Sequence, residues 1–233
     1  MKILKENSLK AKLSCKNEFN IHTSFKHYPH IIKCFGMIHN SAHIGLVLEL
    51  CSEKKNLKDL ISCKKFLTIE EIYHCLPQII DAVAFLHENL IIHRDLKLTN
   101  ILIDSSLQIK VADFGLAIKL KTANDRCKHI VGTPSYTAPE MIKAKDSDGY
   151  SFSVDVWAIG IMMFVLLFGT VPFQGHNTDA TFRQICLCKL TFPFEPIHDF
   201  TKDLIKRLLH PKCFERPSAA NIMKEPFFSN PID

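Results

Sequence analysis

Hydrophobic residues follow two different spacings along the chain, and the change falls near residue 50. Over residues 8–25 the apolar positions recur at near-helical intervals, which predicts a helix. Residues 31–38 and 44–50 are apolar runs of strand length, separated by the turn-prone Asn40-Ser41, and they predict a hairpin. The first part of the chain is therefore expected to combine a helix with a small antiparallel sheet.

After residue 53 the pattern becomes mainly helical. Residues 68–88 carry an apolar stripe at helical spacing, and Thr68 with Glu71 three residues later predicts a capping box. Residues 154–168 are apolar on every face, which predicts a central buried helix. Shorter elements are predicted as helices over residues 56–62, 182–188, 199–209 and 219–224, and as strands over residues 101–103 and 108–111. This order of elements predicts an α+β fold with a small mixed lobe at residues 1–48, a connecting segment at 49–53 and a helical lobe at 54–233.

The composition fits a globular protein and disfavours two classes of partner. The 233 residues are 47% hydrophobic, enough for the core of one large or two modest domains. The net charge of +5 comes from lysines spread along the chain, which indicates a solvated surface and no nucleic-acid site. Residues 156–169 are the most hydrophobic stretch, but they are too few for a membrane span, and the first residues lack the apolar segment of a signal peptide. The nine cysteines include no Cys-x-x-Cys pair, which predicts reduced thiols in an intracellular protein, mostly used as core residues.

Residues 91–103 enclose a cluster of polar side chains between two apolar runs. Asp95, Lys97 and Asn100 follow one another at spacings of two and three, and Asp113 comes shortly after. These 19 residues thus contain a carboxylate base, a cation, an amide and a second carboxylate. Phosphoryl transfer from a metal-bound nucleotide needs these groups, because positioning and charge stabilisation supply most of its catalysis.

Three motifs, in this order and spacing, resemble the signature set of the eukaryotic protein kinases. They are His93-Arg94-Asp95-Leu96-Lys97-Leu98-Thr99-Asn100, Asp113-Phe114-Gly115 and Ala138-Pro139-Glu140. The resemblance implies a bilobal protein-kinase-like fold, with Asp95 as the base for a substrate hydroxyl and Lys97 bridging that base and the transferred phosphate. It also implies ATP as phosphate donor, with Asn100 and Asp113 as ligands of Mg²⁺. A lysine at position 97 resembles the serine/threonine kinases rather than the tyrosine kinases.

The same resemblance implies supporting roles for residues in and beyond these motifs. Asp155 is expected to tie the central helix to the catalytic-loop backbone, and Glu140 and Arg216 to form a buried ion pair. Phe114 is expected to pack under the helix of the small lobe. Nucleotide contacts are implied for Lys2, Glu18, Glu49, Cys51, Leu102, Asn100 and Asp113. Structural or regulatory roles are implied for His93, Arg94, Phe114, His129, Thr133, Glu140, Asp155 and Arg216.

Within the protein kinases, the sequence resembles the polo-like family, which implies a cell-cycle role and placement in the nucleus or cytoplasm. The similar segments are residues 19–22, 49–51, 93–100 and 153–157. A NIMA-like or other cell-cycle kinase is the competing assignment.

The catalytic loop also bears on the protein substrate. Thr99 stands where many kinases that prefer basic substrates carry Glu, so no carboxylate is available there for a substrate arginine. The loop that follows is basic, with Lys119, Lys121, Arg126 and Lys128. We therefore expect protein substrates with acidic residues on the N-terminal side of the target Ser or Thr.

The sequence departs from the family pattern in three places. No glycine occurs before Gly36, so the Gly-rich loop that covers the nucleotide phosphates is missing and the predicted small lobe is incomplete. Lys2 and Glu18 fit the paired strand lysine and helix glutamate of the family, although an ordinary N-terminal lysine fits Lys2 equally well. His129 replaces the phosphorylated Thr that Arg94 would grip, which implies a loop that is constitutively ordered or regulated otherwise.

These departures leave two alternatives to an active serine/threonine protein kinase. One is a pseudokinase or binding module, inactive because its ATP site lacks a cover. The other is a small-molecule kinase of the same broad fold, although the segment around Ala138-Pro139-Glu140 resembles a platform for protein substrates.

Overall fold

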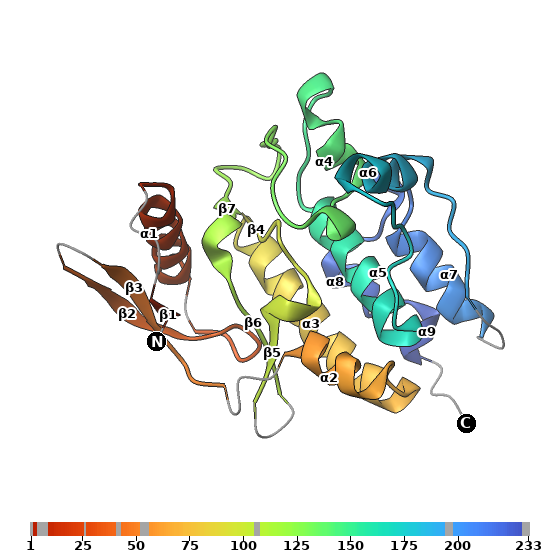
Figure 1. Cartoon of the computed structure of the whole chain (residues 1–233), viewed down its shortest axis with the longest axis horizontal. Coiled ribbons are helices and arrows are strands. Elements are labelled where there is room, and N and C mark those ends of the chain that lie inside the picture. Colours follow the sequence, from red (N-terminus) through yellow and green to blue (C-terminus); the bar gives the residue numbers. More distant parts are fainter. Residues whose placement is uncertain are drawn as a thin grey trace.

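A small lobe of one sheet and one helix lies beside a larger lobe of helices (Figure 1). The computed structural model describes residues 2–3, 9–25, 27–40, 43–51, 56–104, 108–193 and 198–229, with the side chains of residues 2, 3, 9 and 10 outside the described part. The predicted α+β class and its two unequal parts are confirmed. The division at residues 1–48, 49–53 and 54–233 stays a prediction, because most of the connecting segment lies outside the described residues.

The small lobe is an antiparallel sheet in the order β1–β3–β2 with α1 packed against it. Its elements are β1 Lys2–Ile3, α1 Leu9–Thr23, β2 Cys34–His39 and β3 Ile44–Leu48. Where β2 ends, the Asn40 side chain accepts the backbone N–H of His43 at 2.6 Å. Cys15 of α1 packs with Ile44 and Leu46 in a small buried cluster. The predicted helix and hairpin are therefore confirmed.

The predicted start of the first hairpin strand, at residue 31, is wrong. Ile31 forms an isolated parallel bridge with Val111 of the large lobe, and the Ile32 N–H donates to the Val111 carbonyl at 2.9 Å. Both isoleucines are buried, so residues 31–32 join the two lobes and the strand itself begins at Cys34. An apolar run of this length looks the same whether its partner is a neighbouring strand or another lobe.

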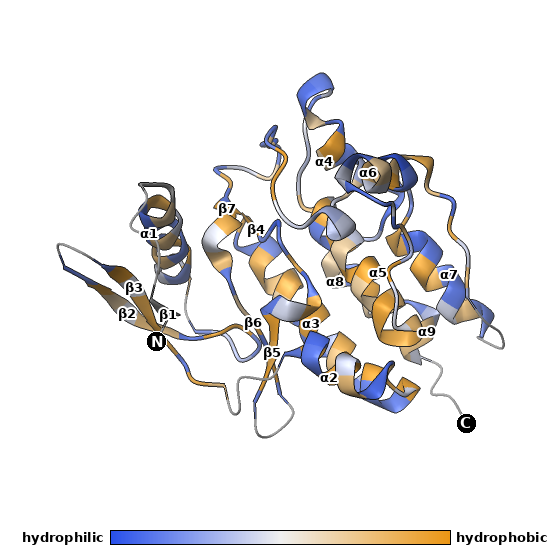
Figure 2. Cartoon of the chain, in the orientation of Figure 1, coloured by the Kyte–Doolittle hydropathy of each residue, from blue (hydrophilic) through white to orange (hydrophobic). Residues whose placement is uncertain are grey.

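The large lobe is built around α5, the helix Ser153–Phe168. Every residue from Val154 to Phe168 is buried, and Figure 2 shows the hydrophobic colour running along α5 among the other helices. Those helices are α2 Leu57–Lys64, α3 Ile69–Glu88, α4 Pro139–Ile142, α6 Thr178–Leu187, α7 Asp199–Leu208, α8 Ala219–Ile222 and α9 Pro226–Ser229. The predicted capping box opens α3, because the Glu71 N–H donates to Thr68 Oγ1 and the Thr68 N–H to Glu71 Oε2. The central buried helix is likewise confirmed.

Two helix boundaries differ from the predicted ones because of local capping. α6 begins at Thr178, four residues before the predicted start, where Asn177 Oδ1 accepts the Ala180 N–H at 2.8 Å. The predicted helix over residues 219–224 ends at Ile222, and a separate short helix begins at Pro226. Proline suits a first helical position, because it has no N–H to leave unsatisfied there.

Two short antiparallel ladders hold the polar cluster at the junction of the lobes. β4 Ile91–Ile92 pairs with β7 Ile118–Lys119, and β5 Ile101–Ile103 pairs with β6 Ile109–Val111. Residues 93–100 therefore form a loop fixed by a strand at each end. Residues 112–117 form a second loop beside it.

The expectations from composition are borne out in part. All nine cysteines lie in the described part of the chain and none forms a disulfide. Cys15, Cys51, Cys75 and Cys127 are buried, and Cys34 and Cys188 are partly buried and pack against the core, so the expectation that most cysteines serve as core residues is confirmed. In the described ranges, no helix has both the length and the apolar character needed to cross a membrane.

Candidate active site

Asp155 fixes the backbone of the loop that carries the polar cluster. Its two carboxylate oxygens accept the backbone N–H groups of His93 at 2.8 Å and Arg94 at 2.9 Å. The ring of His87, at the end of α3, lies 3.0 Å from the same carboxylate. Burial raises the pKa of Asp155, but the hydrogen bond from His87 and the charges of His87 and His93 outweigh it and leave that pKa lowered. The loop is thus tied to an ionised group that α5 holds inside the core.

Asp95, Lys97 and Thr133 form a closed triangle of polar contacts. Lys97 Nζ donates to Asp95 Oδ2 at 2.7 Å and to Thr133 Oγ1 at 2.9 Å. Thr133 Oγ1 donates to Asp95 Oδ1 at 2.8 Å. Asp95 is only 8% exposed, so a hydroxyl that replaced Thr133 as donor would meet an oriented and largely desolvated base.

Asn100 and Asp113 lie at the same end of one strand ladder. Asn100 precedes β5 and Asp113 follows β6, and the Ala112 N–H donates to the Asn100 carbonyl at 2.9 Å. The Asn100 amide nitrogen donates to the Asp95 carbonyl at 2.9 Å, which leaves the amide oxygen as the group able to bind a cation. Asp113 has a left-handed backbone, with φ 67° and ψ 71°.

This donor set fits magnesium bound together with phosphates. One carboxylate and one amide oxygen are few ligands for a cation held by protein alone, and no group of three or more His, Cys, Asp or Glu side chains suited to a metal occurs in the described part. Mg²⁺ commonly takes one or two protein oxygens and fills its other positions with substrate phosphates and water.

Helix α1 packs directly on the segment that holds Asp113. Ser14 Oγ donates to the Gly115 carbonyl at 3.2 Å, and Asn17 Nδ2 donates to the Ala117 carbonyl at 2.8 Å. A Cβ placed on Gly115 would lie 2.7 Å from Ser14 Oγ, so the approach requires glycine. The same point lies 3.5 Å from Asp113 Oδ1 and 3.9 Å from Glu18 Oε2, so both carboxylates lie close to Gly115.

Phe114 fills the space beneath α1. Its ring is fully buried, with centroid distances of 4.8 Å to His22 of α1 and 4.9 Å to His93. His93 is also fully buried, and its Nε2 lies 3.1 Å from the Ala112 carbonyl. The two loops and α1 therefore share one packed aromatic contact.

The remaining residues that were expected to contact the nucleotide lie in different environments. Glu49 Oε1 lies 3.1 Å from Lys110 Nζ and its Oε2 accepts the Lys33 N–H, so the carboxylate is already engaged within the protein. Cys51 is buried, and burial raises the pKa of its thiol. Leu102 is half-buried on β5. Lys2 lies in β1 opposite Leu46, and its side chain falls outside the described part, so its pairing with Glu18 stays a prediction.

Arg94 is joined through neutral groups to the segment between β7 and α4, residues 120–138, which we call the activation segment. Its Nε donates to the Leu116 carbonyl at 2.7 Å, and its Nη1 donates to the Tyr150 hydroxyl at 3.3 Å. That hydroxyl donates in turn to the His129 carbonyl at 2.7 Å. Burial raises the pKa of Tyr150, which keeps the phenol protonated and able to donate. The segment is thus held at His129 by its backbone, while the imidazole is exposed.

Glu140 and Arg216 form a bidentate ion pair. Arg216 Nη1 lies 2.7 Å from Glu140 Oε1, and Nη2 lies 2.8 Å from Oε2. The guanidinium is fully buried, and it also donates to the carbonyls of His210 and Ser153. Its carbon lies 4.9 Å from the centre of the Trp157 ring. Four of the five N–H donors of the arginine therefore have acceptors in the described part of the chain.

Three residues of the site were missed in the sequence. His87 and Tyr150 have no local signal, because their partners are 68 and 21 residues away. Gly132 could have been found from its place in the Gly132-Thr133-Pro134 turn. It has φ 91°, and a Cβ there would lie 2.5 Å from the Arg94 carbonyl and 3.5 Å from Asp95 Oδ1.

Replacing Gly132 by Ala is expected to lower the free energy of unfolding by about 1–3 kcal/mol, because the left-handed backbone and the contact with Arg94 are both strained by a side chain. Urea unfolding measures the loss. Gly36→Ala is the matched control, since a Cβ at Gly36 meets nothing within 4 Å, and its expected change stays within about 0.5 kcal/mol. Equal losses in the two variants would contradict this role of Gly132.

Comparison with known proteins gives the family. A family model described as protein kinase domain matches residues 1–228. The probable serine/threonine-protein kinase PLK of Dictyostelium discoideum is 38% identical over 232 residues, covering 98% of this chain and 23% of that protein. The cell cycle serine/threonine-protein kinase CDC5/MSD2 of Saccharomyces cerevisiae is 37% identical over 222 residues, covering 95% of this chain and 31% of that protein.

A third relative agrees with these two. The serine/threonine-protein kinase polo of Drosophila melanogaster is 37% identical over 210 residues, covering 90% of this chain and 35% of that protein. These three relatives confirm the resemblance to polo-like kinases, and the chain spans between 23% and 35% of their lengths. The chain belongs to the protein kinase domain family.

Proposed function

We propose that the chain is the catalytic part of an ATP-dependent serine/threonine protein kinase with a cell-cycle role in the nucleus or cytoplasm. The observation that carries the activity is the Asp95–Lys97–Thr133 triangle beside Asn100 and Asp113. The family match and the names of the relatives support it.

Each residue of the triangle has a role that follows from its contacts. Asp95 orients the substrate hydroxyl and accepts its proton as the oxygen attacks. Lys97 neutralises charge between Asp95 and the transferred phosphate, and Thr133 holds both side chains in place until substrate binds. Asn100 and Asp113 would hold Mg²⁺, which supplies charge neutralisation on the ATP phosphates.

The proposal is tested with three peptides that differ only in the acceptor, which is Ser, Thr or Tyr. With Mg·ATP we expect a mass increase of one phosphate on the Ser and Thr peptides and none on the Tyr peptide. Phosphorylation of the Tyr peptide at a comparable rate would overturn the assignment to serine/threonine kinases.

The alternative to be excluded is a binding module that has lost the nucleotide site. Thermal unfolding with and without Mg·ATP separates the cases, because a module that has lost the site shows no shift in either the wild type or an Asp113→Ala variant. A shift in the wild type that Asp113→Ala abolishes supports the kinase.

We also propose a preference for acidic residues N-terminal to the target. A depression of about 470 Å³ opens beside Thr133, and its wall includes two cations, Lys58 and Lys97, together with Thr99 and Gln174. No Asp or Glu is among its lining residues. A substrate carboxylate would meet positive charge there, and an arginine would be repelled.

Replacing Lys58 by Glu is expected to lower the ratio of kcat/KM for an acidic over a basic peptide by about 5-fold, the effect of roughly 1 kcal/mol of surface electrostatics. The peptides carry Asp or Arg at two positions before the acceptor Ser. Lys206→Glu makes the same charge change on the distant helix α7 and should leave the ratio unaltered. A wild-type preference for the Arg peptide would refute the acidic assignment.

We further propose that the activation segment needs no phosphate to stay ordered. The hydrogen bonds from Arg94 to the Tyr150 hydroxyl and from that hydroxyl to the His129 carbonyl support this, because both acceptors are neutral groups of the chain and neither is a phosphate. We expect phosphatase treatment to leave wild-type activity unchanged. In a His129→Thr variant, activity should become sensitive to phosphatase and to an added upstream kinase. Loss of wild-type activity on phosphatase treatment would contradict this mode of control.

A further inference from the structure

A groove opens where the C-terminal end of α3 meets the N-terminal ends of α5 and α8. Helix α3 packs against both of the other helices, and the groove measures about 400 Å³. Its polar lining residues include His87, Glu88 and Arg216. Its apolar lining residues are Ala84, Phe152, Val156, Pro217, Ala219 and Ala220. An apolar side chain from another molecule therefore finds a hydrophobic surface in the groove.

The two basic residues of the groove already have partners inside the protein. The fully buried guanidinium of Arg216 is paired with Glu140. The ring of His87 lies 3.0 Å from the buried carboxylate of Asp155, and its centre lies 4.9 Å from the centre of the Phe152 ring. A ligand in the groove therefore meets no cation that lacks a partner in the described part of the chain.

Two carboxylates lie on the side of α3 that borders the groove. Glu88 lines the groove, and Asp81 comes seven residues earlier, which is about two helical turns. Both residues are exposed, and neither forms an ion pair with another described residue. Lys119, whose ladder follows the end of α3, reaches the Ser24 carbonyl at 3.3 Å instead. The two negative charges therefore remain available to a partner.

Tyr28 shows that the two carboxylates act on one small area of surface. Its ring stacks on Phe85 of α3 at a centroid distance of 3.9 Å. Burial raises the pKa of Tyr28 to about 12, and a hydrogen bond with Asp81 and the charges of Asp81 and Glu88 add to the rise. Both carboxylates therefore lie near the same phenol, and a cation placed there is attracted by both.

The groove and the carboxylates together select one kind of ligand. A buried apolar side chain supplies affinity through the area that it removes from water, and surface charge pairs add specificity. A phosphate or a nucleic acid would be repelled by Asp81 and Glu88. A purely apolar molecule would leave both carboxylates unused. A polypeptide with Lys or Arg beside an apolar side chain uses both features.

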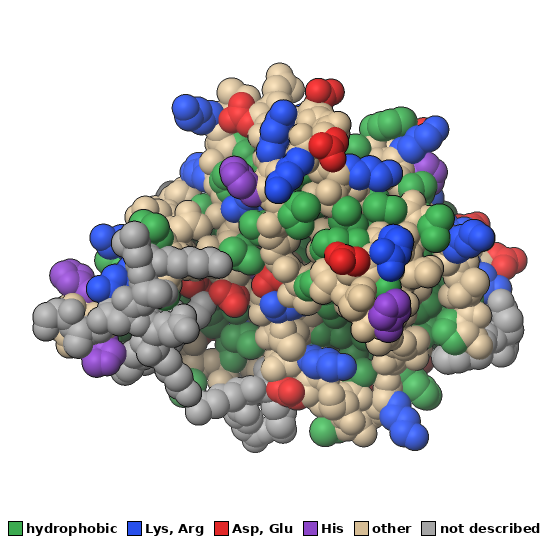
Figure 3. Space-filling model, turned by 45° about the horizontal axis from the view of Figure 1, so that its top comes forward, with side chains coloured by type: hydrophobic (Ala, Val, Ile, Leu, Met, Phe, Trp, Pro, Cys, Tyr) green, Lys and Arg blue, Asp and Glu red, His purple; other side chains and the backbone are tan. Residues whose placement is uncertain are grey.

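The groove is separate from the candidate active site. None of its lining residues lines the depression beside Thr133, so a peptide in the groove does not occupy the place of the acceptor. Its charge also differs from that of the surface around the activation segment, where Figure 3 shows Lys and Arg side chains gathered in the upper part. A basic peptide is therefore directed to the groove by attraction and away from the activation segment by repulsion.

We propose that this groove, which together with Asp81 we name the α3 groove, is a docking site for a polypeptide segment that carries Lys or Arg beside an apolar side chain. The site holds a partner protein at a point remote from the acceptor Ser or Thr. Its use in recruiting substrates rests on the proposed function, whereas binding of the peptide does not.

The test begins with a positional-scanning library of labelled ten-residue peptides. Leu is fixed at position 5, and each pool fixes one amino acid at one other position. By fluorescence anisotropy we expect the Lys or Arg pool, at one or more positions, to bind at least five-fold more tightly than the Asp and Glu pools at the same position. The Asp95→Asn variant should give the same result, so a failure of catalysis does not mask binding.

A single peptide built from the preferred positions then tests the apolar contact. A copy with Ser in place of Leu should bind at least ten-fold more weakly. Ala220→Trp places a large ring at an exposed position of the groove and should weaken binding of the Leu peptide by ten-fold or more. Ala123→Trp makes the same change at an exposed position outside the groove and should leave binding unaltered. Thermal unfolding checks that both variants are folded.

A pair of double variants tests the charge. Asp81→Asn with Glu88→Gln should remove most of the preference for Lys or Arg, and both changes fall on exposed side chains. Asp179→Asn with Asp203→Asn removes the same charge from α6 and α7 and should keep the preference.

Three outcomes would overturn the proposal. They are no preference for Lys or Arg at any position, equal binding of the Leu and Ser peptides, and binding that the Ala220→Trp and Asp81→Asn/Glu88→Gln variants leave unchanged. Binding through Leu without any dependence on charge would identify a site for apolar ligands alone. A basic Leu peptide that loses affinity in both groove variants and in neither control would support the proposal.

Discussion

The Asp95→Asn variant is expected to have a kcat about 10²–10⁴-fold lower than the wild type, with the KM for ATP nearly unchanged. The amide keeps the size of the carboxylate and can still contact Lys97 and Thr133, but it cannot take a proton from the attacking hydroxyl. The loss therefore falls on the chemical step. Steady-state phosphorylation of a Ser peptide at varied ATP measures both constants.

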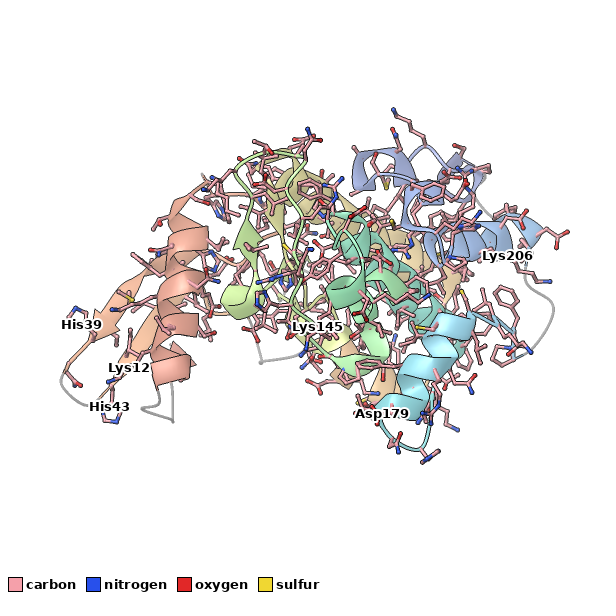
Figure 4. All side chains as sticks on the ribbon, turned by 90° about the horizontal axis from the view of Figure 1, so that it is seen from above. Lys12, His39, His43, Lys145, Asp179 and Lys206 are labelled. Atoms are coloured by element: carbon pink, nitrogen blue, oxygen red, sulfur yellow. The ribbon has the colours of Figure 1, made fainter. Side chains whose placement is uncertain are left out.

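The matched control for this variant is Asp179→Asn, the same change at the start of α6, where Figure 4 shows the side chain at the surface. Its kcat should stay within about two-fold of the wild type. If Asp95→Asn kept kcat within the same limits, Asp95 would not be the base.

The Arg216→Ala variant is expected to lose about 3–5 kcal/mol of unfolding free energy, because it leaves the Glu140 carboxylate without its buried partner. For a chain of this size, that corresponds to a Tm lower by roughly 10 °C. The guanidinium is fully buried with four described acceptors, so little solvent screening reduces the effect. Denaturant unfolding and calorimetry measure the two quantities.

A double variant separates the ion pair from packing. In Glu140→Gln with Arg216→Met, no charge is left unpaired, so this variant should be more stable than Arg216→Ala. Arg183→Ala removes an exposed arginine of α6 and should change stability by less than about 0.5 kcal/mol. A loss in Arg216→Ala no larger than that of Arg183→Ala would show that the pair contributes nothing.

The parts of the fold that could be predicted are those with a local physical cause. The capping box at Thr68 and the all-round apolar sequence of α5 each specify an element without reference to the rest of the chain. Residues 31–32 could not be assigned in this way, because Val111 of the large lobe provides their backbone partner. The break after Ile222 depends on Pro226, whose preference for a first helical position could have been used.

The residues of the candidate site also divide into those with a local signal in the sequence and those that depend on distant parts of the chain. Asp95, Lys97, Asn100 and Asp113 are close in sequence and carry a recognisable pattern, so their grouping could be expected. Thr133 was expected to have a structural or regulatory role, but its bonds to Asp95 and Lys97 depend on the path of the activation segment. Tyr150 was missed because a lone tyrosine gives no sign that it will join Arg94 to His129.

The most direct test of the account is single-turnover transfer of the γ-phosphate of labelled ATP to a Ser peptide, with nucleotide binding measured on the same sample. We predict transfer that requires Mg²⁺ and that Asp113→Asn reduces by at least ten-fold, in line with a metal ligand in the phosphoryl-transfer site. Binding of Mg·ATP by the folded wild type without any transfer would contradict the account, and so would transfer that Asp113→Asn leaves unchanged.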